Sequence, residues 1–293
     1  MKNLRLFLLS ALPLLISGPG LAMAPSIDAV TAEKPTQAGH SISEETASIR
    51  KHHLKRLDDR VNIAPLVLQQ ACRYESEIST APPTKRVVLS FDDGPDMSQT
   101  EYILEVLRKH DIAGAFFLIG EKAKSHPELV AKILAADRHT VGNHSWDHPN
   151  FHDISPAQQA EEVLKYEDAP STGPVKLLFR YPYGNSSCVT NDLLHKRGYR
   201  IVGWHVDSCD WAFDKDGSVD AREALSCGVL AQNRNNYVEH VVSTVRAHKG
   251  GIVLMHEIHA NTIRKLDEII NRLKEEGFVF SSIEDVDFAP TLR

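Results

Sequence analysis

The stretch RVVLSFDDGPD, residues 86–96, decides how the rest of this sequence folds. Its first part, Arg86 to Asp92, is an apolar run of the kind that forms a β-strand buried on both faces. Two aspartates and a Gly-Pro pair then interrupt the run. The stretch therefore predicts a buried strand that ends in charged groups.

Further strands and helices alternate along the chain after this first strand. Short apolar runs with strand character lie at 113–119, 140–144, 176–180, 199–206, 251–256 and 278–282. Helical patterns lie between them at 100–110, 127–136 and 262–276, and two more helices begin with Ser155 and Thr190 as expected N-caps. Because strands that alternate with helices form parallel sheets with crossover helices, the sequence predicts an α/β fold.

Polar residues at the strand ends help to choose between a closed barrel and an open doubly wound sheet. Candidate functional residues follow the first, third, fourth, fifth and sixth predicted strands. In a barrel, the carboxyl ends of all the strands converge on one face. We therefore expect a barrel of about seven parallel strands, with an accessory helix at about 43–68 packed on it.

The segment HSWDH contains two histidines, His144 and His148, at the end of the third strand. Two imidazoles at this spacing can bind one metal ion, and an aspartate from a neighbouring strand end would complete a three-ligand set with room for water and substrate. The alternative is a pair of surface histidines. For Asp92 and Asp93 the alternatives are an ordinary Gly-Pro turn or a phosphatase-type nucleophile, although the latter needs carboxylates spaced by one residue.

Further polar residues lie at the ends of the later strands. Arg180 lies in FRYPYG, Asp207 and Asp210 lie in DSCDW, and His256 ends IVLMH. Each of these residues alone could be part of a salt bridge, a helix cap or the core. Together, polar groups at the same ends of successive apolar strands predict a single active site.

The segments SFDDGPD, HSWDH, FRYPYG, DSCDW and IVLMH resemble, in this order, the five motifs of the polysaccharide deacetylases. This is the NodB-homology group, carbohydrate esterase family 4. The resemblance covers about residues 85–282. It implies a distorted (β/α) barrel, a divalent metal ion and hydrolysis of N-acetyl, sometimes O-acetyl, groups on sugars.

The resemblance also implies a role for each matching residue. The catalytic residues would be Asp92 as general base, His256 as general acid, Arg180 as partner of the base and Asp210 as partner of the acid. The metal ligands would be Asp93, His144 and His148, around Zn²⁺ or, as alternatives, Co²⁺ or Ni²⁺. The substrate-binding residues would be Tyr183 (its backbone N–H), Trp211 and Leu254.

The composition excludes several other classes of protein. Of 293 residues, 42% are hydrophobic, which is ordinary for a chain with a core and rules out global disorder. The formal net charge of −6 supplies no basic field, so we expect no nucleic-acid partner. The 15 histidines are a generous supply of metal ligands and proton-transfer groups, of which the resemblance assigns three.

The N-terminal region predicts an exported protein, periplasmic or extracellular. Lys2 and Arg5 precede an apolar run at 6–16, and small residues follow near 22–24, which is the order of a secretory signal peptide. The run is shorter than the roughly 20 residues that span a bilayer. We expect residues 1–24 to be a signal peptide, with a retained signal-anchor as the alternative, and no membrane span after cleavage.

Export also affects how the four cysteines are interpreted, because disulfides form in oxidising compartments. Three connectivities are possible, and we favour Cys209–Cys227 together with Cys72–Cys188. We expect residues 25–84 to be a linker with the accessory helix, and residues 85–293 to be the catalytic domain.

The sequence thus predicts an exported, metal-dependent hydrolase that removes N-acetyl groups from an amino-sugar polymer or oligosaccharide. Peptidoglycan and chitin-like glycans are the expected substrates, with peptidoglycan favoured because of export. The alternatives are an O-acetyl esterase acting on a polysaccharide such as acetylxylan, and a non-catalytic glycan-binding relative. A two-His-one-carboxylate iron oxygenase would share the ligand types but would need neither an adjacent second aspartate nor a separate histidine acid.

Overall fold

The computed structural model describes residues 47, 50–52, 54–55, 78–169 and 176–293. The chain divides into two compact units, residues 1–39 and 40–293, and the described residues all belong to the second. The predicted signal peptide, most of the predicted linker and Cys72 lie outside the described residues. Between positions 47 and 55 the described residues are helical, and the rest of the accessory helix predicted at about 43–68 lies outside the described residues.

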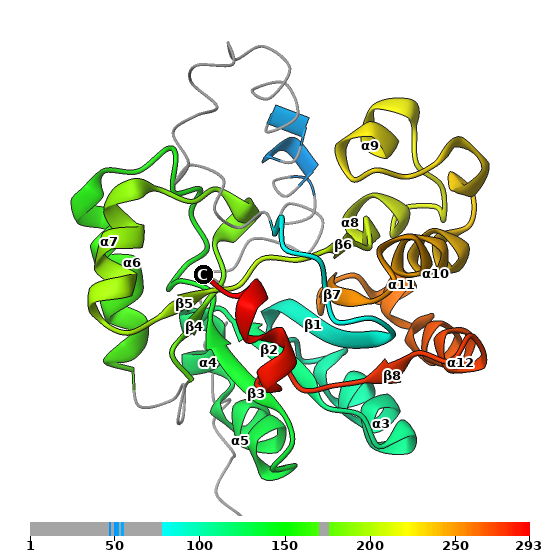
Figure 1. Ribbon diagram of the computed structural model, residues 1–293. Coiled ribbons are helices and arrows are strands. Elements are labelled where there is room, and N and C mark those ends of the chain that lie inside the picture. The colour runs from blue at the N-terminus through cyan, green and yellow to red at the C-terminus, as the bar shows by residue number, and fades with distance from the viewer. Residues whose placement is uncertain (1–46, 48–49, 53, 56–77, 170–175) are drawn as a thin grey trace, which may run out of the picture. The chain divides into compact units, whose positions relative to one another are not determined.

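A single parallel sheet forms the centre of the second unit (Figure 1). Its strands are β1 (Arg86–Gly94), β2 (Gly114–Leu118), β3 (Thr140–Asn143), β4 (Leu178–Phe179), β5 (Arg200–Ile201), β6 (Val206–Asp207), β7 (Gly251–His256) and β8 (Val279–Phe280). Their order is β5-β4-β3-β2-β1-β7-β6, and β8 pairs with the beginning of β1. All of these pairs are parallel, as the alternation of strands and helices predicts.

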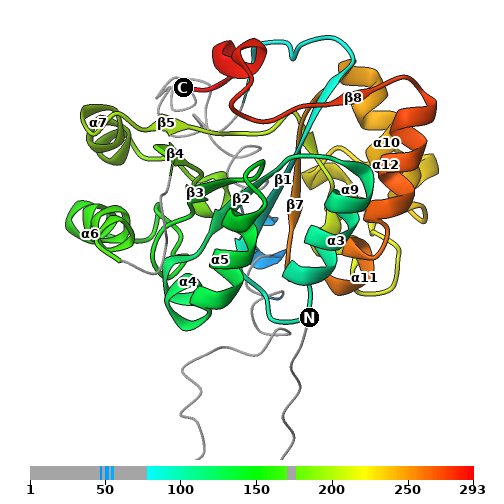
Figure 2. The ribbon, with the colours of Figure 1, turned by 90° about the horizontal axis from the view of Figure 1, so that it is seen from below.

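Helices surround this sheet (Figures 1 and 2). They are α3 (Thr100–His110), α4 (Gly120–Ser125), α5 (Pro127–Ala135), α6 (Pro156–Glu167), α7 (Cys188–Lys196), α8 (Asp210–Phe213), α9 (Ala221–Ser226), α10 (Tyr237–His248), α11 (Ala260–Ile263) and α12 (Leu266–Glu275). Short 3₁₀ turns are η3 (Pro182–Gly184), η4 (Ala231–Asn233) and η5 (Val286–Thr291). The curled sheet and its outer helices form the distorted (β/α) barrel that the sequence predicts.

The helix boundaries agree with the prediction in some places and differ in others. Ser155 caps α6 with a reciprocal capping box to Gln158, as predicted. The N-cap of α7 is Ser187, whose hydroxyl accepts a hydrogen bond from the backbone N–H of Thr190, so the prediction of Thr190 as the cap is wrong. The single helix predicted at 262–276 is two helices, α11 and α12, and Gly277 ends the second with a φ of 77°.

Side chains of the central strands alternate between two apolar environments, as in any strand. On one face of β1, Val87, Leu89 and Phe91 pack into the large cluster that includes the surrounding helices. On the other face, Val88 packs with residues from several strands inside the barrel. The inward positions continue along β1 as Ser90 and Asp92, and along β7 as Ile252, Leu254 and His256. The inner face is therefore apolar where the strands begin and polar where they end.

The single strand predicted at 199–206 is wrong. The chain forms two short strands there, and they lie at opposite edges of the sheet, β5 beside β4 and β6 beside β7. The backbone N–H of Val202 donates to Phe179 O on β4, whereas that of His205 donates to Ile252 O on β7. Residues 202–205 therefore cross between the two edges, and this crossing segment distorts the barrel.

The C-terminal segment closes the end of the barrel at which the strands begin. Phe288 in η5 is fully buried, and it packs with Val88, Ile252 and Phe117 from three strands. Figure 2 shows this segment in red at the top, at the start of the strands. Among the described residues, the helices are all too short or too polar to cross a membrane.

Candidate active site

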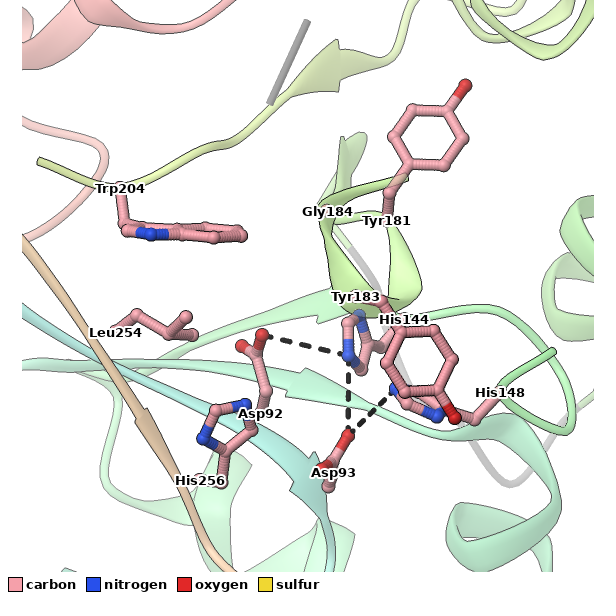
Figure 3. A pocket seen from close by; sticks show the side chains of 10 residues that line it. All are labelled: Asp92, Asp93, His144, His148, Tyr181, Tyr183, Gly184, Trp204, Leu254 and His256. Atoms are coloured by element: carbon pink, nitrogen blue, oxygen red, sulfur yellow. Dashed lines mark ion pairs between the residues drawn. The ribbon is translucent and has the colours of Figure 1, made fainter. Parts of the chain in front are cut away.

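A cavity opens at the carboxyl ends of the strands, on the side opposite Phe288 (Figure 3). Its lining residues come from β1, from the segments after β3 and β4, from the crossing segment and from β7: Asp92, Asp93, His144, His148, Tyr181, Tyr183, Gly184, Trp204, Leu254 and His256. Eight residues predicted from the sequence lie in or directly against this cavity: Asp92, Asp93, His144, His148, Arg180, Tyr183, Leu254 and His256. The geometry thus brings together motifs that are up to 164 positions apart, from Asp92 to His256.

Asp92 and Asp93 both reach the cavity because β1 is irregular at its end. Adjacent side chains of a regular strand point to opposite faces. The strand pairing with β2 shifts register between Asp92 and Gly94, and Asp93 adopts a left-handed φ of 69°. This bulge turns Asp93 into the same cavity as Asp92. The sequence places the end of the strand at Asp92, whereas in the structure β1 continues through Gly94.

The loop after β3 positions the two histidines. Ser145 and His148 have left-handed φ values of 69° and 63°, which fold the segment into a tight turn. Glu162 on α6 holds the turn, because its carboxylate accepts hydrogen bonds from the backbone N–H groups of Trp146 and Asp147. The two imidazole rings lie 4.9 Å apart as a result.

Three of the predicted metal ligands converge within the cavity. Asp93 Oδ1 lies 3.2 Å from His148 Nε2 and 3.4 Å from His144 Nε2. Asp93 is fully buried, and neither of its carboxylate oxygens has a hydrogen-bond partner among the described residues. Leaving a buried carboxylate without partners is costly, so this arrangement fits a bound cation.

The protonation of the histidines also suits metal binding. His144 Nδ1 lies 2.7 Å from the carbonyl oxygen of Arg180, which can only accept, so Nδ1 carries the proton and Nε2 presents a lone pair to Asp93. Burial lowers the pKa of His148 to about 3, against the opposing charge of Asp93, so His148 is neutral. The set of one carboxylate and two imidazoles fits Zn²⁺.

Arg180 contacts Asp92 deep inside the barrel. Its Nη1 atom donates to Asp92 Oδ1 at 2.7 Å and to Ser90 Oγ at 2.9 Å, and its guanidinium lies 4.2 Å from the centre of the Phe117 ring. The side chain is fully buried, and burial lowers its pKa from the usual arginine value while Asp92 opposes this effect. The predicted pairing of Arg180 with Asp92 is therefore present.

Arg180 also supports the crossing segment. Its Nε and Nη2 atoms donate to the carbonyl oxygens of Val202 (3.2 Å) and Gly203 (3.1 Å). These bonds satisfy carbonyl groups where the chain leaves one strand and has not yet reached the next. Trp204, the following residue, lines the cavity, and Figure 3 shows its ring above Leu254.

Several residues in or beside the cavity, among them Trp204 and Ser90, are outside the set predicted from the sequence. Trp204 could not be found because the segment was assigned to a strand. Ser90 is different, because strict alternation along β1 places it on the same face as Asp92, and that alternation is visible in the sequence. Its hydroxyl donates to Val253 O and accepts from Arg180, which links the two strands that carry Asp92 and His256.

Asp210 and His256 form a second buried pair. His256 Nδ1 lies 2.8 Å from Asp210 Oδ1, and the backbone N–H of His256 donates to Asp210 Oδ2 at 2.6 Å. Burial would lower the pKa of His256, but Asp210, together with smaller effects of Asp93 and Asp92, outweighs burial and raises the pKa to about 10. The strand register aligns His256 with Asp92, so the two predicted proton-transfer residues are neighbours on β7 and β1.

Two of the three predicted substrate-binding residues line the cavity, and the third lies elsewhere. Leu254 and Tyr183 line the cavity, and Tyr183 has a left-handed φ of 56°, with its ring 4.6 Å from that of His148. Trp211 is buried in the large apolar cluster and is absent from the described lining of the cavity, where Trp204 is present. The predicted roles of Tyr183, Trp211 and Leu254 stay predictions.

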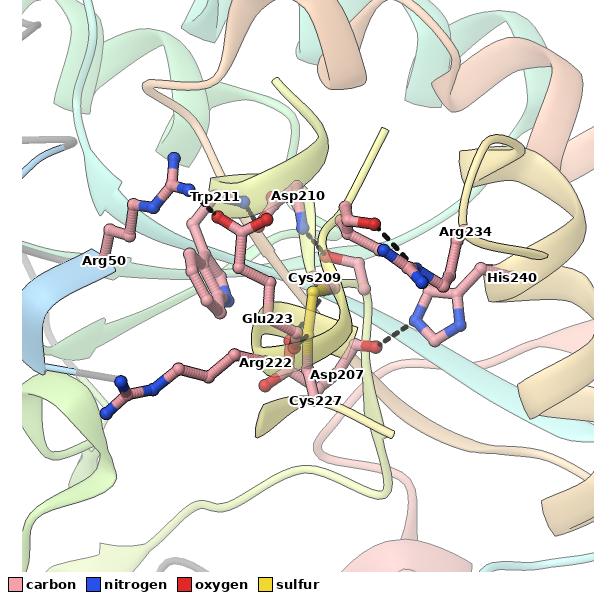
Figure 4. Close-up of a disulfide and its surroundings, with 12 residues drawn as sticks. Arg50, Asp207, Cys209, Asp210, Trp211, Arg222, Glu223, Cys227, Arg234 and His240 are labelled. Carbon is pink, nitrogen blue, oxygen red and sulfur yellow. Dashed lines mark hydrogen bonds and ion pairs between the residues drawn. A yellow bond between two sulfur atoms is a disulfide. The ribbon is translucent and has the colours of Figure 1, made fainter. Parts of the chain in front are cut away.

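The disulfide predicted between Cys209 and Cys227 is present in the structure, directly next to Asp210 (Figure 4). It links the residue before α8 to the residue after α9, and Asp210 is the first residue of α8. Cys188 is also disulfide-bonded, and its predicted partner Cys72 lies outside the described residues. The disulfide thus anchors the short helix that carries Asp210.

The chain matches known proteins over the region that contains these residues. A family model described as polysaccharide deacetylase matches residues 79–202. The peptidoglycan-N-acetylglucosamine deacetylase PgdA of Listeria monocytogenes is 34% identical over 212 residues, which cover 72% of this chain and 40% of that protein. The chain thus spans less than half the length of this relative.

Two further matches cover most of the similar protein. A peptidoglycan-N-acetylglucosamine deacetylase of Bacillus cereus is 32% identical over 212 residues, which cover 70% of this chain and 72% of that protein. The solved structure of a family 4 carbohydrate esterase from Streptomyces lividans, in complex with acetate, has a TM-score of 0.54 and 30% identity, covering 67% of this chain and 91% of that one. With its barrel and its ordered motifs, this chain belongs to the polysaccharide deacetylase family, carbohydrate esterase family 4.

Proposed function

We propose that this protein is a metal-dependent hydrolase that removes N-acetyl groups from an amino-sugar glycan. One observation carries the proposal. A single cavity combines the buried carboxylate of Asp93, which faces two histidines, with an arginine-paired Asp92 and an aspartate-paired His256. Hydrolysis of an amide needs these functions together: activation of the carbonyl group, a base for water and an acid for the leaving nitrogen.

Asp93, His144 and His148 would hold a divalent metal ion, with Zn²⁺ as the expected ion and Co²⁺ or Ni²⁺ as alternatives. When bound, the ion would supply Lewis-acid activation of the acetyl carbonyl group and of water. The N–H of His144 Nδ1, held by Arg180 O, keeps the Nε2 lone pair directed toward the ion. This ligand set leaves coordination positions open, as a catalytic site requires.

Asp92 would act as the general base. Arg180 engages its Oδ1 atom, while Oδ2 lies 3.6 Å from His144 Nε2 and so faces the metal ligands. The carboxylate, held in place by the buried guanidinium, can take a proton from the attacking water. The water oxygen then bonds to the acetyl carbon, and the predicted backbone N–H of Tyr183 would stabilise the developing oxyanion.

His256 would act as the general acid. Its Nδ1 is bonded to Asp210, so Nε2 is the nitrogen available to the cavity. With a pKa raised to about 10, the ring is protonated at neutral pH. As the bond between carbon and nitrogen breaks, the amine nitrogen takes this proton, and acetate and a free amino sugar are the products.

Peptidoglycan is the substrate that we propose first. The relatives from Listeria monocytogenes and Bacillus cereus are named for the deacetylation of peptidoglycan N-acetylglucosamine. The expected signal peptide would bring this protein to the same compartment as a cell-wall glycan, periplasmic or extracellular. Chitin-like oligosaccharides and acetylxylan are the alternatives, the last of them through O-acetyl hydrolysis.

The test is acetate release from a panel of peptidoglycan, chito-oligosaccharides and acetylxylan. We expect release from an N-acetylated glycan, its loss after treatment with a chelator and its recovery on addition of Zn²⁺. His256→Ala should reduce kcat by about 100-fold or more while the protein keeps its metal. Exposed His195→Ala is the matched control and should behave like the wild type.

Three outcomes would contradict the proposal. Release only from acetylxylan would favour an O-acetyl esterase. Binding to glycans without release from any of them would indicate a non-catalytic relative. Full activity of the His256→Ala protein would mean that His256 is not the general acid.

A further inference from the structure

A second cluster of potential metal ligands lies behind His256, outside the predicted metal site. It consists of Asp210, His256 and His259, and one ligand atom of each lies within 4.8 Å of the others. All three side chains are buried, with His259 and Asp210 fully so. The rings of His256 and His259 lie 5.4 Å apart in an edge-to-face arrangement.

His259 has no evident structural role for its polar atoms. Neither Nδ1 nor Nε2 has a hydrogen-bond partner among the described residues, although the side chain is completely buried. The nearest carboxylate outside the cluster, Asp214 Oδ2, is 4.0 Å from Nδ1, which is too far for a hydrogen bond. Buried polar groups in native proteins are almost always paired, so an unpaired imidazole indicates a missing ligand, either water or an ion.

The donor types in this cluster are those of a transition-metal site. Two imidazoles and one carboxylate are the same combination as Asp93, His144 and His148. A tetrahedral ion with bonds of about 2 Å holds its ligand atoms roughly 3.3 Å apart. The cluster needs only a small movement to reach this geometry, because its ligand atoms are already within 4.8 Å of one another.

We propose that Asp210, His256 and His259 form a second, inhibitory site for a divalent ion of the zinc type. An ion enters through the cavity that His256 lines. It takes the place of the proton on His256 Nδ1, which leaves to solvent, and it breaks the 2.8 Å contact with Asp210 Oδ1. Because this contact must be broken, the second site binds its ion more weakly than the site at Asp93.

Occupation of the second site blocks proton transfer. With an ion on Nδ1, His256 keeps one proton, on Nε2, and would become an imidazolate if it gave that proton away. Such a ring is a poor acid for a leaving amine. The inhibition rests on the proposed function of His256, whereas the existence of the second site does not.

The binding test counts zinc ions by equilibrium dialysis with zinc alone. The wild type should bind two ions per chain, one tightly and one weakly. His259→Leu and His259→Gln should lose only the weak ion, His148→Ala should lose only the tight one, and His195→Ala should keep both. One ion per chain in the wild type, or two in both His259 variants, would overturn the second site.

The activity test uses the same proteins at increasing zinc concentration. Acetate release by the wild type should rise to one equivalent of zinc and then fall. In the His259 variants the half-inhibiting concentration should increase about tenfold or more, each curve being normalised to its own maximum. Two bound ions without a fall in activity would overturn the inhibitory role, and two bound ions with no acetate release at any concentration would overturn the proposed function but not the site.

Discussion

Several residues around the cavity adopt left-handed backbone conformations although they are not glycines. Asp93, Ser145, His148, Tyr183 and Cys209 have φ values between 56° and 69°. Such conformations cost free energy in residues with a Cβ atom, and they concentrate at functional sites. Each of them turns the chain directly at, or next to, a residue that faces the cavity or supports it. The sequence motifs thus contain both the reactive side chains and the left-handed residues that turn these side chains toward the cavity.

Gly94 shows how tightly the end of β1 is packed. A Cβ atom at this position would overlap the carboxyl group of Glu257, which is fully buried and hydrogen-bonded to Thr100. We predict that Gly94→Ala lowers the free energy of unfolding by about 1–3 kcal/mol, as overpacking does, measured by urea denaturation. In a Glu257→Ala background, Gly94→Ala should lower the free energy of unfolding by less, because the carboxyl group that the new Cβ atom would overlap is gone. An unchanged stability of the single variant would mean that Glu257 can move away at no cost.

The pairing of Asp210 with His256 makes a prediction about pH. Asp210 raises the pKa of His256 to about 10 against the effect of burial, so activity in the wild type should fall only as the pH rises through about 10. In Asp210→Asn the largest of the charges that raise this pKa is absent, so burial lowers the pKa against only the smaller effects of Asp93 and Asp92. The alkaline fall of kcat should therefore move toward neutral pH, and the relative loss of activity should be greater at pH 9 than at pH 6.

The measurement is kcat against pH for the wild type, Asp210→Asn and Asp192→Asn. Asp192 is an exposed aspartate of α7, so its variant should follow the wild-type curve. If the alkaline fall of kcat stays at the same pH in Asp210→Asn, Asp210 does not set the pKa of His256.

At the scale of elements, the crossing segment between β5 and β6 has the largest consequence. A regular strand at 199–206 would bond to one neighbour throughout, and Arg180 would then have no free carbonyl groups to contact. Because the segment changes neighbours, the carbonyls of Val202 and Gly203 are free to accept from Arg180. The irregularity of the barrel thus fixes the guanidinium that contacts Asp92.

The disulfide stabilises another pair of elements, the helices α8 and α9. Cys209 and Cys227 are 18 positions apart, and closing a loop of this size stabilises a protein by about 3 kcal/mol in the chain-entropy model. We predict that the double variant Cys209→Ser/Cys227→Ser loses about this much unfolding free energy under oxidising conditions. The variant should also lose activity, because Asp210 begins α8.

A reductant supplies the control for this prediction. With the other disulfide of Cys188 also reduced in both proteins, the wild type and the double variant should become equally stable. If the double variant stays less stable than the wild type under reducing conditions, the loss comes from disturbed packing at buried Cys209 and not from the missing cross-link.

At the scale of the whole barrel, chemistry and stability lie at opposite ends. The polar cavity lies where the strands end, and the apolar cluster around Phe288 lies where they begin. This separation is general in barrels of this kind, because loops at the carboxyl ends carry the function. Changes at the two ends should therefore have separable effects.

Phe288→Ala tests this separation. Removing a fully buried phenylalanine should lower the free energy of unfolding by about 3–5 kcal/mol, whereas kcat of the folded protein should stay within about twofold of the wild type. The nearby Val286→Ala is the matched control, because Val286 is 79% exposed and should contribute little. A large fall in kcat for Phe288→Ala under conditions in which it is folded would mean that the two ends are coupled.

The sequence by itself determined the α/β class and most of the strands and helices, because these depend on local patterns of apolar residues and caps. It also identified Asp92, Asp93, His144, His148, Arg180, Asp210 and His256 as a group, since parallel strands bring their carboxyl ends to one edge. The expected compartment predicted disulfides, and Cys209–Cys227 belonged to the favoured one of three possible connectivities.

Only the tertiary structure decided how these side chains meet. The bulge at Asp93, the crossing at 202–205 and the burial of His259 depend on neighbours that are distant in sequence. Local apolar patterns cannot show a change of neighbours within a strand, so Trp204 was missed. A backbone turn or an unpaired buried nitrogen is likewise a property of the packed barrel, because it exists only once other elements surround it.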